Sequence, residues 1–276
     1  MNNILSVVLD LDGTLLNTQR EVSQRNLHAV LDCHKNGIQI IIATARPSRS
    51  VRMLLPEALL QLGCMIYYNG AHTVDSSYET EDHVLIDHET VSDLYDAITA
   101  QSGEPLVCFE AQDAIFCNRS LASKHFDILG MPSDAPIPTV LSREGINQLC
   151  PSKLLFPNVQ NIYTELKSSF SHRVKLILTD GSRLVQIMNS SVSKAGALGQ
   201  VLNRRGLHPD QVMVFGDDYN DLELFDLCGY PVAMGNAINE LKIKAARITE
   251  TNDDDGVAAV LEALLQSRRT AGFLST

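Results

Sequence analysis

The amino-acid sequence predicts an α/β protein in which a doubly wound parallel sheet forms the core and an α+β domain is inserted into it. Three observations carry this prediction. Nearly continuous apolar runs occur near both ends of the chain, which is typical of strands buried on both faces. Helical patterns alternate with those runs. The long middle part lacks this regularity and combines short strands with amphipathic helices.

The first part of the core is a β-α-β-α-β run. Its first helix starts after Ser23, a good N-cap, and ends before Gly37, as a helix-ending glycine indicates. Pro47 begins the second helix, because proline fits the first helical position. The strands expected around these helices are the apolar, β-branched segments Ile4–Leu11, Ile38–Ala43 and Met65–Tyr68.

The pattern changes after about Ala71, where short strands and helices are joined by Gly, Pro and Ser turns. The expected helices are Val91–Ala100 and Val159–Ser168. The expected strands are Leu106–Glu110, Ala114–Asn118, Lys153–Phe156, Val174–Leu178 and Arg183–Met188. We therefore expect a core domain over residues 1–75 and 190–276, with an inserted α+β domain over residues 76–189.

The core pattern resumes at Ser193, with a helix that ends at Gly206 and a buried strand over Val212–Phe215. The last expected elements are the helix Leu222–Leu227, the strand Pro231–Ala233 and the helix Val257–Leu265. Ligands of such sheets bind beyond the carboxyl ends of the strands. The residues that directly follow each strand are therefore the candidate functional residues.

Composition excludes several functions. The 276 residues include 22 Lys and Arg against 33 Asp and Glu, a net charge of −11, which argues against nucleic acid or anionic membranes as partners. No apolar stretch reaches the ~18–20 residues of a membrane span. The six cysteines are scattered and lack zinc-site spacing, so we expect reduced, mostly buried thiols in a cytoplasmic protein.

Two carboxylates follow the first strand in the segment Asp10-Leu11-Asp12-Gly13-Thr14. Taken alone, this segment favours a turn in which Asp10 is a cap, because such tripeptides are common.

A second acidic group follows the strand Val212–Phe215 and contains Asp217, Asp218 and Asp221. Asp221 is compatible with a simple helix N-cap. Asp217 is harder to explain, because beside Asp10 and Asp12 it creates a negative charge that is costly without a hard divalent cation.

Two further segments offer phosphate-binding groups. Thr44, Ala45 and Arg46 follow the second strand with a hydroxyl, backbone N–H groups and a guanidinium, although a helix cap explains them as well. Lys194 lies at a helix start, where a cation opposes the helix dipole by ~0.3–1 kcal/mol. We therefore expect Lys194 to have a compensating partner, and its removal to leave the fold intact or slightly more stable.

In their order along the chain, the carboxylate pair, the Thr44 segment, Lys194 and the second acidic group resemble the motifs of the haloacid dehalogenase superfamily of aspartate-nucleophile phosphatases. Within this superfamily the chain resembles the Cof-type subfamily, which has a large cap domain between the second and third motifs. The resemblance implies a Rossmann-like core and an α+β cap. It covers nearly the whole chain except the cap interior. The matching segments are Asp10–Leu16, Ala43–Arg46, Val192–Lys194 and Gly216–Asp221.

The resemblance also implies a mechanism. Asp10 is implied as the nucleophile that forms an aspartyl-phosphate, and Asp12 as the general acid and base. Mg²⁺ is the implied cofactor, and its implied ligands are Asp10, the Asp12 backbone carbonyl, Asp217 and Asp218. The implied phosphate-binding residues are Leu11, Thr44, Ala45, Lys194 and Asn220. The substrate is expected to be a small-molecule phosphate such as a sugar phosphate, a nucleotide or a cofactor phosphate.

Two departures from the family pattern stand out. Ala45 replaces the usual Gly and is expected to restrict the loop over the phosphate, and Asn189-Ser190-Ser191 replaces a Pro-Lys-Gly stretch.

Other functions remain open at this point. A phosphomutase or phosphotransferase of the same superfamily would use the same carboxylates. A metal-dependent glycosyltransferase also uses an Asp-x-Asp segment but does not require the Thr, Lys and second acidic motif. A non-catalytic binding module is the weakest alternative, because every catalytic carboxylate is present.

Overall fold

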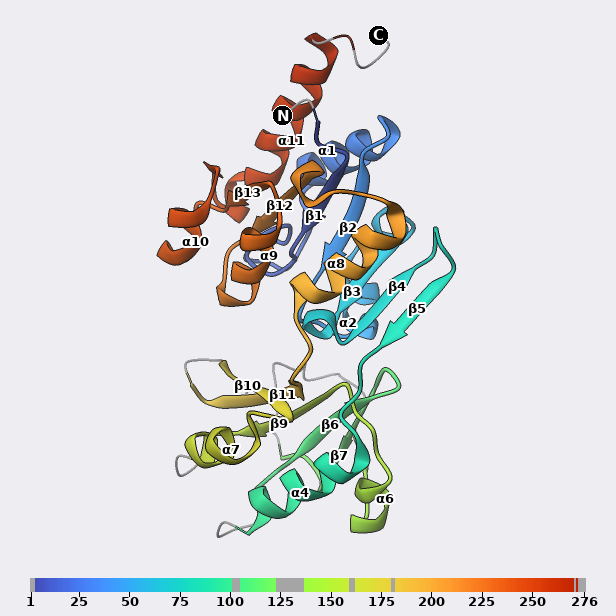
Figure 1. Ribbon diagram of the computed structural model, residues 1–276, viewed down its shortest axis with the longest axis vertical. Helices are drawn as coiled ribbons and strands as arrows, with labels where there is room; N and C mark the ends of the chain where they lie inside the picture. The colour runs from blue at the N-terminus through green and yellow to red at the C-terminus, as the bar shows by residue number, and fades with distance from the viewer. Residues whose placement is uncertain are drawn as a thin grey trace. The chain divides into compact units, whose positions relative to one another are not determined.

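The computed structural model describes residues 3–100, 105–122, 137–158, 162–179, 182–270 and 272 of the 276-residue chain (Figure 1). The chain divides into two compact units. One comprises Met1–Asp82 and Ser193–Thr276, and the other comprises His83–Val192.

The first unit contains an eight-stranded sheet in the order β14-β13-β12-β1-β2-β3-β4-β5. Neighbouring strands from β14 to β3 are parallel, and β4 is antiparallel to β3. The predicted doubly wound core is therefore confirmed. The strands are β1 (Ser6–Leu9), β2 (Gln39–Ala43), β3 (Cys64–Tyr67), β4 (His72–Asp75), β5 (Thr80–His83), β12 (Val212–Gly216), β13 (Tyr230–Ala233) and β14 (Arg247–Ile248).

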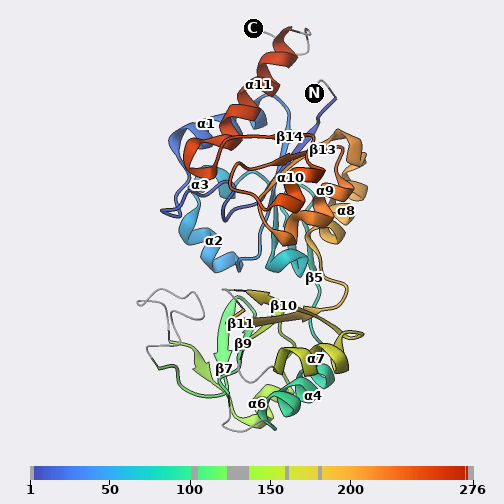
Figure 2. The same cartoon turned by 90° about the vertical axis from the view of Figure 1, so that its left-hand side faces the viewer.

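Helices cover both faces of this sheet (Figure 2). On one side lie α1 (Gln24–Lys35), α3 (Glu57–Leu60) and α11 (Gly256–Thr270), and on the other lie α8 (Lys194–Arg205) and α9 (Leu222–Leu227). The shorter helices are α2 (Ser48–Leu54), α10 (Asn239–Lys244) and the 3₁₀ turns η1 (Tyr68–Gly70), η2 (Pro209–Gln211), η3 (Tyr219–Asp221) and η4 (Asn252–Asp254). Because both sheet faces are covered, β1 is buried along its whole length.

Local sequence sets the helix ends as expected. The Ser23 side chain accepts a hydrogen bond from the Asn26 N–H at 3.0 Å and caps α1, and Ser193 caps α8 in the same way through Gly196. Gly206 ends α8 in the left-handed conformation, at φ +64°. These caps fix where α8 begins and hence where Lys194 lies.

The second unit has its own sheet, in the order β10-β11-β9-β6-β7-β8, and its own apolar core. Phe109, Leu154 and Val185 of this core lie on the sheet face that packs against its helices. The strands are β6 (Cys108–Ala111), β7 (Ala114–Cys117), β8 (Thr139–Val140), β9 (Lys153–Pro157), β10 (Val174–Thr179) and β11 (Leu184–Asn189). The helices are α4 (His88–Thr99), α6 (Arg143–Asn147) and α7 (Ile162–Phe170); residues 159–161, the start of the expected helix Val159–Ser168, lie outside the described residues.

The unit boundary differs from the range 76–189 expected from the sequence. The compact unit spans His83–Val192, because β5 joins the core sheet next to β4. The sequence of β5, Thr-Glu-Asp-His, has no apolar pattern that would indicate a strand.

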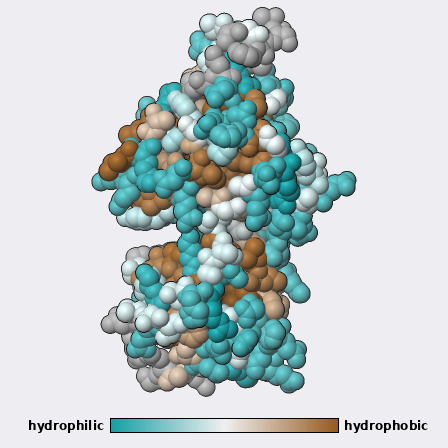
Figure 3. All heavy atoms as spheres, in the orientation of Figure 1, coloured by the Kyte–Doolittle hydropathy of each residue, from teal (hydrophilic) through white to brown (hydrophobic). Residues whose placement is uncertain are grey.

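The surface is mostly hydrophilic on the face shown in Figure 3, and hydrophobic side chains gather over α10, where Ile243 is 84% exposed. Among the described residues, no helix combines the length and apolarity needed to cross a bilayer.

Candidate active site

The carboxyl ends of β1, β2 and β12 share one edge of the core sheet, because the three strands are adjacent and parallel. Leu9 of β1 is in register with Ile42 of β2 and with Phe215 of β12. Asp10, Thr44 and Asp217 directly follow these strands. The three segments predicted from the sequence to carry functional groups therefore reach the same edge.

Lys194 joins this edge from the first turn of α8. Its Nζ donates to Asp10 Oδ1 at 2.5 Å and to Asp221 Oδ1 at 2.8 Å. The lysine is 1% exposed, and both carboxylates are buried. The two carboxylates compensate the unfavourable position of the ammonium group at a helix N-terminus, which was the sign that Lys194 needed a partner.

Burial and charge act against each other in this cluster. Burial raises the pKa of Asp10 well above its ordinary value; Lys194 opposes this effect, and Asp221 and Asp217 add to it. Burial alone would lower the pKa of Lys194, but the Asp10 and Asp221 carboxylates outweigh it and raise that pKa. The site thus has a firmly cationic lysine and a surplus of buried acid, which an additional cation would relieve.

Asp217 is the third carboxylate at this edge. Its Oδ1 accepts a hydrogen bond from Thr14 Oγ1 at 3.2 Å. Burial, together with the Asp221 carboxylate, raises the pKa of Asp217 to about 7, although the Thr14 hydrogen bond acts in the opposite direction.

Gly13 leaves the space that the Asp217 carboxylate occupies. It adopts φ +75°, and a Cβ at this position would lie 2.2 Å from Asp217 Oδ2. A side chain here would both strain the backbone and displace the carboxylate.

Asp12 lies apart from the buried cluster and is exposed. Arg46 forms a bidentate ion pair with Asp12. Its Nε donates to Oδ2 and its Nη2 donates to Oδ1, both at 2.6 Å. The Arg46 N–H donates to Thr44 Oγ1 at 3.1 Å, which fixes the start of this loop. From the sequence, Arg46 was expected to offer a phosphate-binding guanidinium, and its pairing with Asp12 was not predicted.

The remaining predicted residues have varied surroundings. Leu11 and Thr44 are buried, and Ala45 is half-buried. Asn220 donates from Nδ2 to Asn69 Oδ1 at 3.0 Å. Asp218 is exposed, and its Oδ1 accepts from the Tyr219 N–H at 2.8 Å.

Carboxylate oxygens at this edge could hold a metal ion. Asp10, Asp217 and Asp221 each offer one oxygen, and these oxygens lie within 4.8 Å of one another. A set of hard, anionic oxygens fits Mg²⁺. Both carboxylate oxygens of Asp221 already accept hydrogen bonds. Its Oδ1 accepts from Lys194 Nζ, and its Oδ2 accepts from the Asp217 N–H at 3.1 Å. Asp10 and Asp217 are therefore the better ligands.

Asp221 is a residue that sequence reasoning missed, since it was interpreted only as a possible helix cap. Its side chain is fully buried and ties Lys194 to the loop after β12. One sequence signal could have found it: a lysine at a helix start needs compensating negative charge, and Asp221 lies in the acidic segment that follows the strand Val212–Phe215.

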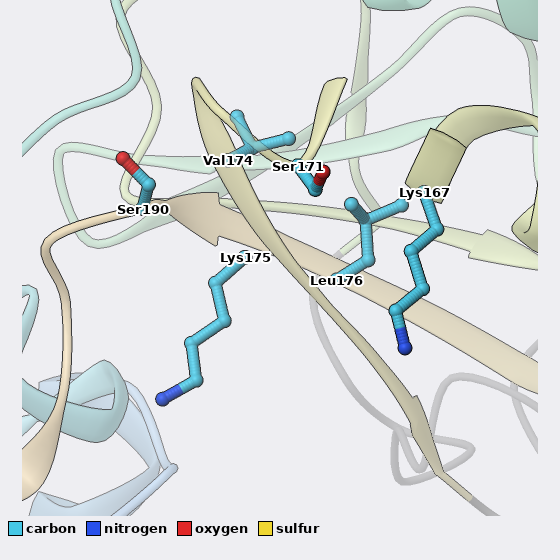
Figure 4. Close-up of a pocket in the computed structure, with 6 residues that line it drawn as sticks. All are labelled: Lys167, Ser171, Val174, Lys175, Leu176 and Ser190. Atoms are coloured by element: carbon cyan, nitrogen blue, oxygen red, sulfur yellow. The ribbon is translucent and has the colours of Figure 1, made fainter. Parts of the chain in front are cut away.

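A separate cavity of about 230 Å³ lies in the second unit (Figure 4). None of the predicted catalytic residues lines it. In Figure 4 the side chains of Lys167 and Lys175 both run downward, and their nitrogen atoms lie well apart, so they do not converge on one point. The lining residues are Lys167, Ser171, Val174, Lys175, Leu176 and Ser190.

The chain belongs to the haloacid dehalogenase-like hydrolases, whose family model matches residues 7–261. It is 28% identical to the 5-amino-6-(5-phospho-D-ribitylamino)uracil phosphatase YwtE of Bacillus subtilis over 288 residues, covering 95% of this chain and 98% of the relative. The phosphatase YwpJ of B. subtilis is 27% identical over 290 residues, with 94% and 99% of the two chains covered. The crystal structure of a haloacid dehalogenase-like hydrolase from Bacteroides thetaiotaomicron has a TM-score of 0.81 at 26% identity and covers 95% of this chain and 99% of its own.

These likenesses confirm the family and the fold that the sequence motifs indicated, and with them that the chain is a hydrolase. Enzymes of this family generally use a divalent metal ion, in keeping with the acidic cluster at the sheet edge.

Proposed function

We propose that the protein is a Mg²⁺-dependent phosphatase that hydrolyses a small-molecule phosphate ester through an aspartyl-phosphate on Asp10. One observation carries this proposal most directly: the Asp10 carboxylate, at the end of the central strand, is held through Oδ1 by the buried Lys194. A carboxylate fixed in this way, with its other oxygen available for attack, is suited to be a nucleophile.

Asp10 attacks phosphorus in the first step, and the bond from phosphorus to the leaving oxygen breaks. Asp12 gives that oxygen a proton. In the second step water attacks the aspartyl-phosphate, Asp12 takes the proton from the water, and the bond from phosphorus to Asp10 breaks. Lys194 balances the negative charge on the phosphoryl oxygens, together with Thr44, Asn220 and the backbone N–H groups of Leu11 and Ala45.

The Arg46–Asp12 ion pair gives the acid–base group a resting position. A proton donor must reach the leaving oxygen, so Asp12 has to exchange this contact for one with the substrate. An incoming phosphate is itself a good partner for a guanidinium. We therefore expect substrate binding to draw Arg46 toward the phosphate and release Asp12.

Mg²⁺ fits the oxygen set of Asp10 and Asp217, with the Asp12 backbone carbonyl and Asp218 as the further expected ligands. When bound, it supplies positive charge that lets an anionic carboxylate approach an anionic phosphate. The chain itself contributes the preparation of this site: Gly13 leaves room for the Asp217 carboxylate, and Thr14 orients it.

The natural substrate is best sought among small phosphate esters. The relative YwtE is named for dephosphorylating a phosphoribitylamino-uracil. Phosphorylated ribityl compounds therefore belong in a test panel with sugar phosphates, nucleotides and cofactor phosphates. We further propose that the inserted unit, His83–Val192, selects among these esters, and that the protein works in the cytoplasm.

The test is hydrolysis of an activated aryl phosphate with Mg²⁺ and with excess chelator. We expect activity only with Mg²⁺, no aspartyl-phosphate in Asp10→Asn, and a loss of about 10²–10⁴-fold in Asp12→Asn, the usual size of general acid–base catalysis. The loss in Asp12→Asn should shrink for acidic leaving groups, which need little protonation. Full turnover in chelator, or an active Asp10→Asn variant, would refute the proposal.

Product analysis separates the alternatives. Release of inorganic phosphate indicates a phosphatase, whereas return of the phosphoryl group to an alcohol indicates a mutase or phosphotransferase. Consumption of a nucleotide sugar without phosphate-ester hydrolysis would indicate a glycosyltransferase.

A further inference from the structure

We propose that Cys108 and Cys117, in the second unit, form a reversible disulfide that closes the β6–β7 hairpin. This inference does not depend on the phosphatase activity. The two sulfur atoms lie 2.8 Å apart, and both residues are fully buried. They need to approach by less than about 1 Å to reach the ~2.05 Å of a disulfide bond.

The strand register places the two cysteines directly opposite each other. Cys108 of β6 pairs with Cys117 of antiparallel β7. The neighbouring Asn118 N–H donates to the Val107 carbonyl at 3.1 Å, which makes Val107 and Asn118 a hydrogen-bonded pair. Because the two kinds of pair alternate, Cys108 and Cys117 form a non-hydrogen-bonded pair, where opposite Cα atoms are ~4.5 Å apart. That spacing lies within the ~4.4–6.8 Å range of disulfides.

The hairpin turn holds this register. Strands β6 and β7 are joined by Gln112 and Asp113, both with positive φ, as in a tight two-residue hairpin turn. The two cysteines are nine residues apart in the sequence, and this spacing alone does not show that they pair. Which residues face each other is decided by the position of the turn.

The oxidation step requires an external oxidant, which we take to be a low-molecular-weight disulfide. Each cysteine loses a hydrogen, one sulfur–sulfur bond forms in the protein, and the oxidant is reduced to two thiols. The reaction needs a thiolate. The contact with Cys117, together with burial, raises the pKa of Cys108, so the closed hairpin reacts slowly.

Local opening of β7 provides access. Ala114 is exposed, and Ile115 and Phe116 are only half-buried. On its outer side β7 pairs with β8, which has two exposed residues. A strand with so little cover opens more readily than a central one, and the disulfide then opposes further opening.

The experiment equilibrates the intact protein with glutathione disulfide, alone and in sub-denaturing urea, which promotes opening of β7. Remaining thiols are then alkylated, and the chain is cleaved at Asp113, between the two cysteines. We expect two peptides that stay linked until a reductant is added. Cys117→Ser should remove the link, whereas Cys64→Ser, a change at another buried strand cysteine, should leave it intact.

A second measurement compares thermal unfolding of the oxidised and reduced protein. We expect a higher Tm for the oxidised form and no oxidant-dependent shift in Cys117→Ser. Alkylation of both Cys108 and Cys117 after equilibration in urea would overturn the proposal. A disulfide between any other pair of cysteines would overturn it as well.

Discussion

Lys194 is the residue at which sequence and structure give opposite expectations for stability. The helix dipole alone suggests a gain of ~0.3–1 kcal/mol when the cation is removed. The structure reverses the sign, because Lys194 is buried against Asp10 and Asp221, and breaking a buried ion pair costs ~3–5 kcal/mol. The larger effect decides the expected sign, so we now expect a loss of stability in place of the slight gain that the helix dipole alone suggests.

We therefore expect Lys194→Ala to lower the free energy of unfolding by a few kcal/mol and kcat/KM by about 10²-fold or more. Urea unfolding and phosphatase kinetics measure the two effects. Lys242, whose Nζ donates to the Gly235 carbonyl at 2.7 Å, provides a matched control. Lys242→Ala should change kcat/KM little, and near-normal kinetics in a folded Lys194→Ala variant would remove Lys194 from the site.

Asp217 makes the metal-free protein sensitive to pH. Its pKa rises from 3.8 to about 7 on folding, so the folded state holds a proton that the unfolded state has lost. This proton stabilises the fold fully below about pH 4, and the contribution is lost as the pH rises through about 7. In chelator, the Tm of the wild type should fall more steeply from about pH 5 to about pH 8 than that of Asp217→Asn. Equal slopes for the two proteins would contradict the assignment.

The residues at the strand ends show which parts of the candidate site can be predicted from the sequence. Asp10, Thr44 and Asp217 could be placed correctly, because each directly follows an apolar run and parallel strands end at one sheet edge. The contact of Asp221 with Lys194 and the pairing of Arg46 with Asp12 could not be predicted. Both depend on the conformation of a short loop and on side-chain directions, which the hydrophobic pattern of the sequence does not indicate.

At the scale of elements, a buried ion pair connects helix α8 to the sheet. Arg205, at the end of α8, donates from Nε and Nη2 to both oxygens of Asp75 in β4, at 2.8 and 2.7 Å. Its Nη1 donates to Gln39 Oε1 in β2 at 2.6 Å. These contacts hold strands β4 and β2 against the same helix that carries Lys194.

Asp75→Ala should lower the free energy of unfolding by ~3–5 kcal/mol, because it leaves the Arg205 charge buried without its partner. The exposed pair Arg25–Glu262 serves as the control, and Glu262→Ala should cost no more than ~1 kcal/mol. Chemical denaturation compares the two variants. Similar losses in both would mean that burial of the Arg205 pair contributes nothing.

Two of the strands that the sequence missed, β5 and β14, have a common physical reason. Strand β5 is polar and partly exposed, and β14 has only two residues, so neither carries an apolar pattern long enough to recognise. They are strands because β4 and β13 offer them a pairing edge. Buried strands such as β2 and β12, in contrast, are specified by their own composition.

At the scale of the whole molecule, each unit has a core of its own. The residues His83–Val192 bury a cluster that includes Phe109, Leu154 and Ile187. We expect this fragment, expressed alone, to unfold cooperatively in a thermal circular-dichroism scan. Leu154→Asp, which places a charge in the cluster, should abolish the transition. A fragment without any cooperative transition would show that its core depends on the rest of the chain.

The order of the strands along the chain has a consequence for synthesis on the ribosome. Strand β1 gains β2 as a neighbour early, but its other neighbour, β12, is separated from it by the whole second unit. Roughly 200 residues must be added before β12 emerges, which takes ~10–40 s at ~5–20 residues per second. Throughout that interval an apolar strand edge lies open on the nascent chain, while the second unit can already fold. We expect the nascent chain to need chaperones most while the second unit is being made, and Asp10 to contact Lys194 only after that unit is complete.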